Sequence, residues 1–399
     1  MRLAPAWLSD SDLQNLIAIL QGKARFVGGC VRDAFLGIEA QDIDVATVFS
    51  PQEIVNLLKN ANIRALETGV LHGTITALLP NRAVEITTLR RDVACDGRHA
   101  VVEFSDSWEE DAKRRDFTCN ALSMNKDGEV FDYCGGIEDL HQKIVRFVGD
   151  PALRVREDYL RVLRYFRFLA RFSGPIDSAS MQACVSAAAD TNQLSGERIY
   201  KEMRAILQAR YASKSLALMQ EHKVVLPFLP QFSAQELRAI ARLEDLAEEI
   251  KEAKDQRLRS AILLASSEEK QQEIFLKRLR YPRAEAKIVQ QLIAACRCEL
   301  QDEKNWQIFL VENGLELAVL AVLGAFSLAD DFSVEKTSSQ IKKMCGWEIP
   351  EFPLKGQDFL DSGFESSPQI GEMLVRAREF WIDSGFTLTA AQLFEKSKR

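Results

Sequence analysis

Residues 25–45 read RFVGGCVRDAFLGIEAQDIDV, and this stretch decides how the rest of the chain is interpreted. The apolar run RFV predicts a strand that ends in two glycines, and residues 31–37 predict a short helix. A second strand is expected at residues 42–48, which read DIDVATV. Strand, glycine turn, helix and strand in so short a segment predict a mixed α+β domain.

The two glycines stand where the first strand gives way to the helix. Glycine lets the backbone approach a phosphate closely, and the following amides and Arg32 can hold that phosphate. Glycine pairs are also common in ordinary turns, and the G-x-G-x-x-G spacing of dinucleotide-binding proteins is missing. Gly28, Gly29 and Arg32 are therefore candidate phosphate-binding residues that need support from their neighbours.

Two aspartates, Asp42 and Asp44, follow the predicted helix. Residues two apart on a strand share one face, so the carboxylates should lie together while Ile43 and Val45 face the core. Mg²⁺ prefers carboxylate ligands, and two such ions can clamp the attacking and leaving oxygens of a phosphoryl transfer. An isolated D-x-D is usually structural or solvated, but this pair follows a phosphate-type turn. We therefore predict that it is catalytic and binds metal.

Two later segments carry further polar candidates. The strand AVEITTL, residues 83–89, offers Glu85 either as a third carboxylate or as a solvated side chain. In RRDFTCNAL, residues 114–122, the two arginines can hold a triphosphate and Asp116 can accept a hydrogen bond from a ribose hydroxyl. The alternative for this second segment is a surface ion pair at a helix start.

In residues 156–168, REDYLRVLRYFRF, arginine recurs every third position from Arg161 to Arg167. Apolar residues repeat at the same interval, so a charged row and an apolar row should wind side by side along one helix. Asp158 precedes the arginine row by one turn, whereas a merely solvated helix would mix lysine and glutamate. The bland alternative is a structural ion pair.

The 399 residues are too many for one compact core, so two to four domains are expected. A helix capped by Ser9 or Asp10, a helix at residues 51–61, and hairpin turns at Pro80-Asn81 and Asp127-Gly128 complete the α+β part. After Gly149-Asp150-Pro151 nearly everything reads as helical. The predicted division is a small mixed β-sheet head at 1–148, followed by an all-α neck at 149–212, body at 213–300 and tail at 301–399.

The formal net charge of −7 argues against a nucleic-acid binder, because phosphate contacts need lysine and arginine. Between residues 143 and 171, however, eight basic residues stand against three acidic ones, so a polyanion could bind there. The eight cysteines show no disulfide or zinc pattern, which favours free thiols in a reducing compartment. No signal peptide or membrane span is evident, and a cytoplasmic location is expected.

Taken together, these segments resemble the class II CCA-adding enzymes and bacterial poly(A) polymerases of the polymerase-β nucleotidyltransferase superfamily. The resemblance runs from Arg25 to about Leu207 and rests on GGCVRD with DID, on RRDFTCNAL, on EDYLR (157–161) and on SGERIYKEM (195–203). It implies metal ligation by the two aspartates, ribose recognition by the second motif and base reading by the third, with the last motif supporting them.

The resemblance also completes the set of expected site residues. Those expected to bind the nucleotide are Gly29, Arg32, Arg115, Asp116, Asp158, Arg161, Arg164 and Arg167. Those expected to support the site are Gly28, Glu85, Arg114, Asn120, Glu157, Glu197 and Arg198.

The implied activity is template-independent addition or repair of the 3′-terminal CCA of tRNA with CTP, ATP and Mg²⁺, releasing pyrophosphate. Residues 87–104, TTLRRDVACDGRHAVVEF, resemble a flexible loop of full CCA-adding and A-adding enzymes that CC-only enzymes lack. The chain lacks the arginine-rich signature and basic tail of poly(A) polymerases, and its four histidines show no phosphohydrolase pairing. An A-adding enzyme, a poly(A) polymerase and, from a different class, an inactive RNA-binding module remain as alternatives. No protein partner is evident.

Overall fold

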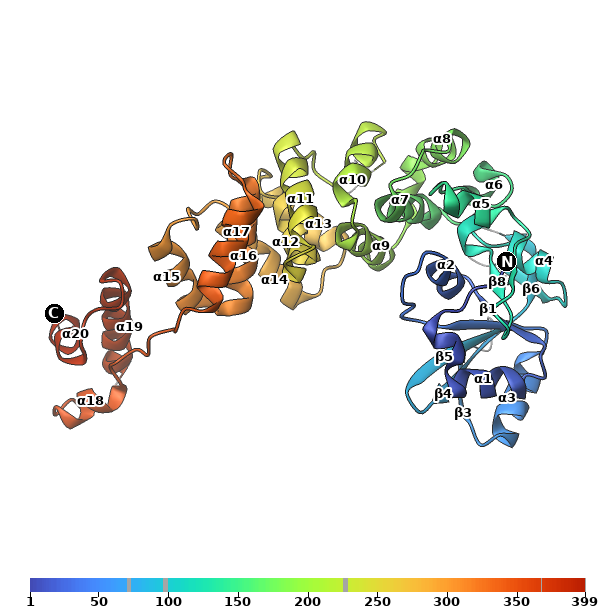
Figure 1. Ribbon diagram of the computed structural model, residues 1–399. Helices are drawn as coiled ribbons and strands as arrows, with labels where there is room; N and C mark the ends of the chain where they lie inside the picture. Colours follow the sequence, from blue (N-terminus) through green and yellow to red (C-terminus); the bar gives the residue numbers. More distant parts are fainter. Residues whose placement is uncertain (70–72, 96–99, 225–228, 367, 399) are drawn as a thin grey trace. The chain divides into compact units, whose positions relative to one another are not determined.

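The computed structural model describes residues 1–69, 73–95, 100–224, 229–366 and 368–398. The chain divides into two compact units (Figure 1). The first contains Met1–Gln231 and Glu269–Tyr281, and the second contains Phe232–Glu268 and Pro282–Arg399. The predicted boundaries at 148, 212 and 300 fall inside these units, so the division into head, neck, body and tail stays a prediction.

A seven-stranded sheet, in the order β3-β4-β5-β2-β1-β8-β9, forms the core of the first unit. The pair β2–β5 is parallel and the other neighbours are antiparallel, so the predicted α+β class with a mixed sheet is confirmed. The strands are β1 (Ala24–Val27), β2 (Asp44–Thr47), β3 (Arg64–Gly69), β4 (Thr74–Leu79), β5 (Arg82–Thr88), β8 (Ser123–Met124) and β9 (Val130–Phe131).

The elements around this sheet follow the local sequence signals. Asp10, rather than Ser9, caps α1 (Ser11–Ile19) by accepting hydrogen bonds from the amides of Asp12 and Leu13. A capping box formed by Ser50 and Glu53 begins α3 (Pro51–Asn60). Both predicted hairpin turns join antiparallel neighbours, β4 to β5 and β8 to β9. A separate two-stranded hairpin, β6 (Arg90–Cys95) and β7 (Ala100–Phe104), lies within the segment predicted to be a flexible loop.

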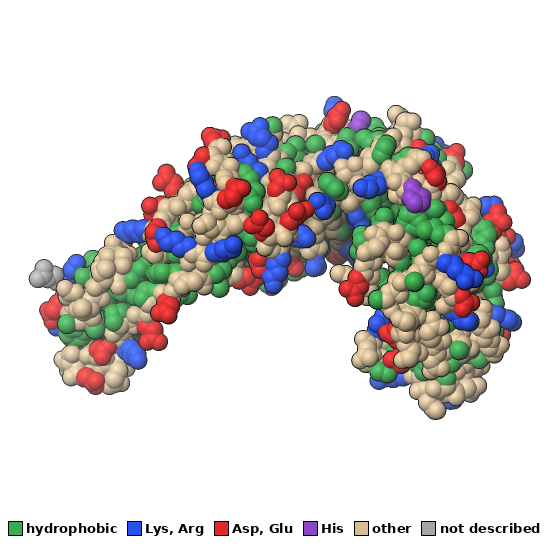
Figure 2. All heavy atoms as spheres, in the orientation of Figure 1, with side chains coloured by type: hydrophobic (Ala, Val, Ile, Leu, Met, Phe, Trp, Pro, Cys, Tyr) green, Lys and Arg blue, Asp and Glu red, His purple; other side chains and the backbone are tan. Residues whose placement is uncertain are grey.

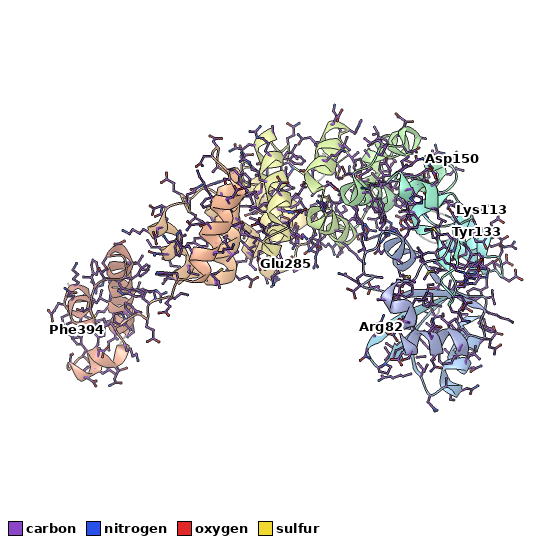
Figure 3. The ribbon with its side chains drawn as sticks, viewed as in Figure 1. Arg82, Lys113, Tyr133, Asp150, Glu285 and Phe394 are labelled. Carbon is purple, nitrogen blue, oxygen red and sulfur yellow. The ribbon has the colours of Figure 1, made fainter. Side chains whose placement is uncertain are left out.

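The prediction of one continuous helix over residues 156–168 is wrong. The structure has two helices, α6 (Pro151–Glu157) and α7 (Leu160–Phe172), joined through Asp158 and Tyr159. Asp158 has an extended backbone, and its carboxylate accepts a hydrogen bond from the amide of Leu160 at 3.0 Å. Aspartate at a helix start satisfies an amide that has no partner inside the helix, and this favours the break. At the start of α6, Asp150 caps the helix by accepting hydrogen bonds from the amides of Ala152 and Leu153 (Figure 3).

Beyond α7, helices complete the first unit. α7 packs against α9 (Gly196–Gln208) and α10 (Ala212–Glu221), and α8 (Ser178–Ser186) packs against α6. The returning helix α13 (Glu269–Arg278) belongs to this unit as well. A side chain at Gly196 would place its Cβ 2.3 Å from the carbonyl oxygen of Arg278, so the close approach of this segment to α9 requires glycine there.

The described part of the second unit is helical, as predicted. Its helices are α11 (Ala234–Leu246), α12 (Gln256–Leu263), α14 (Arg283–Ala295), α15 (Glu303–Asn313), α16 (Leu315–Leu328), α17 (Val334–Cys345), α18 (Gly356–Asp361), α19 (Pro368–Asp383) and α20 (Ala390–Ser397). α16 is buried along most of its length, and the last three helices share a small core around Phe359 and Trp381. On the face drawn in Figure 2, acidic and basic side chains of this unit are interspersed. Among the described residues, no helix has the length and apolar character needed to cross a membrane.

Candidate active site

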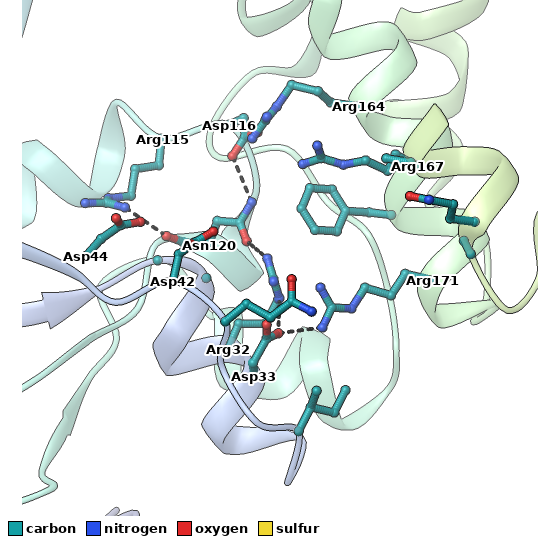
Figure 4. A pocket seen from close by; sticks show the side chains of 18 of the residues that line it. Arg32, Asp33, Asp42, Asp44, Arg115, Asp116, Asn120, Arg164, Arg167 and Arg171 are labelled. Carbon is teal, nitrogen blue, oxygen red and sulfur yellow. Dashed lines mark hydrogen bonds and ion pairs between the residues drawn. The ribbon is translucent and has the colours of Figure 1, made fainter. Parts of the chain in front are cut away.

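An open cavity of about 840 Å³ lies in the first unit, and residues of the first two predicted motifs meet arginines of α7 in it (Figure 4). Its walls come from the turn before α2 (Gly29–Phe35), the start of β2, the segment around η3 (Thr118–Asn120), and helices α7 and α9. The predicted residues that line it are Gly28, Gly29, Arg32, Asp42, Asp44, Arg115, Asp116, Asn120, Arg164 and Arg167.

The two aspartates share this cavity, as the alternation of strand side chains predicts. Asp44 is the first residue of β2, whereas Asp42 lies in the bend before the strand and is exposed. Ile43 and Val45 are buried, so the intervening side chains anchor the segment in the core. The prediction that both aspartates belong to the strand is wrong for Asp42, but the predicted common orientation holds because both line the cavity.

Negative charge accumulates around Asp44. It pairs in register with Glu85 across the parallel strands β2 and β5. Burial, Glu85 and Asp42 raise the pKa of Asp44, and Arg115 offsets this only in part. Within the described residues, no lysine or arginine lies within ion-pair distance of Asp42 or Asp44. The pair therefore favours a bound cation. Glu85 is exposed and does not line the cavity, so its role as a third carboxylate stays a prediction.

These carboxylates fit a divalent ion that a nucleotide helps to hold. In the described part of the chain, no three His, Cys, Asp or Glu side chains come together as a complete metal cluster. Mg²⁺, however, is usually bound through one or two carboxylates together with substrate phosphates and water. Asp42 and Asp44 are the residues that would hold such an ion.

Gly28 is needed at the turn that leads into α2. Its φ of +72° belongs to the region that favours glycine, and an added Cβ would lie 3.0 Å from Nη1 of Arg115. The glycine therefore gives the backbone its turn and leaves room for the arginine of a distant motif.

A chain of hydrogen bonds joins the head to helix α7. Asp33 accepts from Arg32 at 2.8 Å and from Arg171 at 2.7 Å. Arg32 is buried and also donates to Oδ1 of Asn120 at 2.6 Å. The amide of Asn120 then donates to Asp116 at 3.1 Å, so its role as a supporting residue has a structural basis.

The same network continues from Asp116 to α9. Nε of Arg164 donates to Asp116 at 2.7 Å, and Nη1 of Arg167 lies 3.0 Å from the buried carboxylate of Glu202. Burial alone would raise the pKa of Asp116, but Arg164 and the hydrogen bond from Asn120 outweigh burial and hold that pKa below its ordinary value. Asp116 is thus a permanently charged acceptor near neutral pH.

The third motif lies outside the lining of this cavity. Asp158 accepts a hydrogen bond from Arg198 at 2.7 Å, and Arg161 pairs with Glu157 and donates to the carbonyl oxygen of Arg154 at 2.8 Å. Neither Asp158 nor Arg161 is among the lining residues. Glu197, the other expected supporting residue on α9, pairs with Arg280.

Sequence reasoning missed several residues that the fold brings to this site. Arg171 and Phe168 line the cavity, and Asp33, Asp111 and Glu202 hold its arginines. Arg171 could have been found by extending the arginine row of α7 by one further turn. These acids gave no comparable signal, because their contacts depend on which helices pack together.

Comparison with known proteins adds independent findings. A family model described as the poly(A) polymerase head domain matches residues 24–146. A second, described as a probable RNA- and SrmB-binding site of polymerase A, matches residues 175–236. The human mitochondrial CCA tRNA nucleotidyltransferase 1 is 35% identical, and the match covers 97% of this chain and 89% of that protein. The CCA-adding enzyme of Streptococcus sanguinis is 32% identical, with 94% of both chains covered.

Solved structures agree with these matches. The Bacillus stearothermophilus CCA-adding enzyme in complex with CTP superimposes with a TM-score of 0.79 at 25% identity, covering 98% of this chain and 97% of that one. The Thermotoga maritima CCA-adding enzyme complexed with tRNA gives a TM-score of 0.68 at 20% identity, with 100% and 99% covered, and supports the fold alone.

Proposed function

The chain belongs to the family of CCA tRNA nucleotidyltransferases, or CCA-adding enzymes, and from this premise we propose that it builds or repairs the 3′-terminal CCA of tRNA. It joins the 3′-hydroxyl of the RNA to the α-phosphate of CTP twice and then of ATP, and releases pyrophosphate. The observation that carries the proposal is a pair of carboxylates with no lysine or arginine at ion-pair distance among the described residues, placed in a cavity that arginines also line.

Membership of a nucleotidyltransferase family implies a divalent metal, and we propose that the ion is Mg²⁺. When bound, Mg²⁺ would lower the pKa of the attacking hydroxyl and neutralise charge on the triphosphate. Asp42 and Asp44 provide hard oxygen ligands that a magnesium ion prefers. The buried Ile43 and Val45 fix the segment that carries both carboxylates, so the ligands are already oriented before a nucleotide enters.

The arginines that line the cavity are the proposed triphosphate and ribose site. Arg32, Arg115, Arg164 and Arg167 present guanidinium groups, which match phosphate geometry by donating two parallel hydrogen bonds. Asp116 is proposed to accept a hydrogen bond from a ribose hydroxyl. The lowered pKa of Asp116 supports this, because an ionised carboxylate can only accept.

Base selection is proposed to come from Asp158 and Arg161. Cytosine and adenine both present an amino donor beside a ring-nitrogen acceptor, which Asp158 and Arg161 can match. Their contacts support fixed orientations, because Glu157 binds the guanidinium of Arg161 and Arg198 binds the carboxylate of Asp158. Uracil and guanine present a carbonyl where Asp158 needs a donor and an N–H where Arg161 needs an acceptor. Polar groups of the base and of the protein would then stay unpaired.

Full CCA addition, rather than A addition alone, is part of the proposal, and so are tRNA binding by the helical tail and a cytoplasmic location. The hairpin of β6 and β7 supports the addition of A, because it occupies the segment that resembles the loop absent from CC-only enzymes, and full CCA addition is distinguished from A addition alone by the experiment below. The free thiols of the seven described cysteines fit a reducing compartment. One relative is named a mitochondrial protein, so the location needs its own test by microscopy of a tagged chain.

The decisive experiment uses tRNA transcripts that end before C74, C75 and A76 in standard tRNA numbering. Each transcript is offered CTP, ATP, UTP or GTP singly, with and without Mg²⁺. We expect C addition to the first two transcripts and A addition to the third, all dependent on Mg²⁺. Addition of A alone would identify an A-adding enzyme, long A tails on any RNA a poly(A) polymerase, and no incorporation an inactive RNA-binding module.

A further inference from the structure

Asp111 is a buried aspartate at the heart of α4 (Trp108–Lys113), and no step proposed above uses it. It is 3% exposed and does not line the cavity. The carboxylate nevertheless contacts both arginines of the RRD segment, with Oδ1 2.7 Å from Arg114 and Oδ2 3.0 Å from Nη2 of Arg115. Each of the two arginines therefore contacts its own carboxylate oxygen of Asp111.

The contact with Arg115 is specific to one edge of its guanidinium. Nε and Nη2 both donate to Oδ2 of Asp111, at 3.3 Å and 3.0 Å. Nη1 is left on the side of the turn at Gly28, where it donates to the carbonyl oxygen of Asn120 at 3.4 Å. The planar guanidinium cannot turn without breaking the pair with Asp111, so Asp111 determines which donors face the cavity.

The helix that carries Asp111 is itself held in place. The ring of Trp108 lies against the guanidinium of Arg25, 4.3 Å from ring centroid to Cζ, and Arg25 belongs to strand β1. Ser107 caps the helix by accepting from the amide of Glu110, and Glu110 accepts from Ser105. The carboxylate therefore stands on an element tied to the central sheet.

We propose that Asp111 is a positioning residue for nucleotide binding: it holds the Nε–Nη2 edge of Arg115 and so directs Nη1 toward the phosphates of the incoming nucleotide. This role rests on the proposed function, in which Arg115 contacts that nucleotide. Burial alone would raise the pKa of Asp111, but Arg115 and Arg114 outweigh it and keep the carboxylate charged, as the role requires.

A double-mutant cycle tests the role with Asp111→Asn, Arg115→Gln and the double variant, in the full chain with Mg²⁺. Because Arg115 would bind the nucleotide equally in the ground state and the transition state, KM should change more than kcat. Asp111→Asn should raise KM for CTP and ATP about 10-fold, the effect of one charged hydrogen bond, with kcat changed less than about 3-fold. The double variant should be no worse than Arg115→Gln, since Asp111 acts through Arg115.

Two further variants separate positioning from stability. Asp139 is also a buried aspartate of this unit, held by Thr118 and Arg146, neither of which lines the cavity. Asp139→Asn should lower Tm while leaving both KM values unchanged. Asp111→Glu keeps the charge and both oxygens, and should raise KM less than Asp111→Asn does.

The outcomes are distinct. An unchanged KM in Asp111→Asn, or fold-changes that multiply in the double variant, would overturn the positioning role while the proposed function stands. Wild-type protein that incorporates no nucleotide would overturn both. Should Asp111→Asn not fold, Arg115→Lys decides: lysine keeps the charge but has no edge for Asp111 to hold, so KM must rise about 10-fold, and an unchanged KM refutes the role.

Discussion

Asp44 and Glu85 lie directly opposite each other on the parallel strands β2 and β5, so two carboxylates share one face of the sheet without an intervening cation among the described residues. Burial adds to this repulsion and raises the pKa of Asp44. Such an arrangement is unfavourable for the protein alone, and the proposed divalent cation on Asp42 and Asp44 would relieve the repulsion at Asp44.

We expect Asp44→Asn to abolish nucleotide addition while raising the Tm of the metal-free protein by roughly 1–3 °C, because the substitution removes one of the repelling charges. Added Mg²⁺ with CTP should raise the Tm of the wild type and leave that of the variant unchanged. Thermal melts in EDTA and in Mg²⁺, together with incorporation assays, provide the check. A variant that keeps a substantial fraction of the wild-type rate would show that Asp44 is not a metal ligand.

Acid stability should depend on Asp116. Its pKa in the folded protein lies below the ordinary aspartate value of about 3.9, so the unfolded chain binds more protons in that interval. The stability that Asp116 contributes is fully present above about pH 4 and is lost as pH falls through the lowered pKa. Asp116→Asn should reduce Tm by ~4–8 °C at pH 7. The difference from wild type should shrink in melts below pH 4; a difference that stays constant down to pH 2 would assign the effect to packing.

Removal of the proposed template should relax base selection. Asp158→Ala and Arg161→Ala each delete one hydrogen-bonding partner of the base, which should reduce the preference for CTP and ATP over UTP and GTP by about 10- to 100-fold. Single-nucleotide incorporation with all four triphosphates measures this preference. Arg198→Ala removes the side chain that orients Asp158 but no base contact, so it should lower the preference less than Asp158→Ala does. A uniform fall in rate with unchanged preference would contradict the template.

Shortening the chain between Asp92 and Arg98 should spare C addition and block A addition. This segment contains the end of β6 and most of the connection to β7, and residues 96–99 lie outside the described part of the chain. Adenine is larger than cytosine, so the pocket must re-form around it, and we assign that movement to the segment that resembles the flexible loop. The measurement is the ratio of A to C addition on matched transcripts. A glycine–serine replacement of equal length is the control, and normal CCA completion by the shortened protein would refute the role.

Binding of tRNA should weaken steeply with salt and should depend on RNA shape. A chain of net charge −7 has few clusters of lysine and arginine, so each phosphate contact matters. A protein that neutralises several phosphates loses affinity by orders of magnitude between low and physiological salt. Stacked acceptor arms should be preferred through backbone and 2′-hydroxyl contacts. Filter binding at several salt concentrations compares tRNA with unstructured RNA of equal length. Equal affinities would rule out recognition by shape.

Much of the fold could be predicted because its signals are local. The two apolar strands around GGCVRD, the cap at Asp10, the box at Ser50 and Glu53 and both hairpin turns depend on residues within a few positions of one another. The break at Asp158 went unpredicted, although aspartate favours a helix start, because arginines stand on both sides of it, at positions 156 and 161, and favour a single charged helix. A periodic side-chain pattern does not reveal that the backbone leaves the helix for two residues.

For this protein, the sequence by itself determined the mixed α+β head, the helical remainder and the identity of most cavity residues, because motif residues are fixed by type and by spacing along a strand or helix. Only the tertiary structure decided which of them meet. Arg171 reaches Asp33 from 138 residues away, and Glu202 reaches the arginines of α7 from a different helix. Asp158 instead pairs with Arg198, and Arg161 with Glu157, and neither Asp158 nor Arg161 lines the cavity. Such pairings depend on how helices pack, and packing follows from the burial of side chains distant in sequence, which no local spacing records.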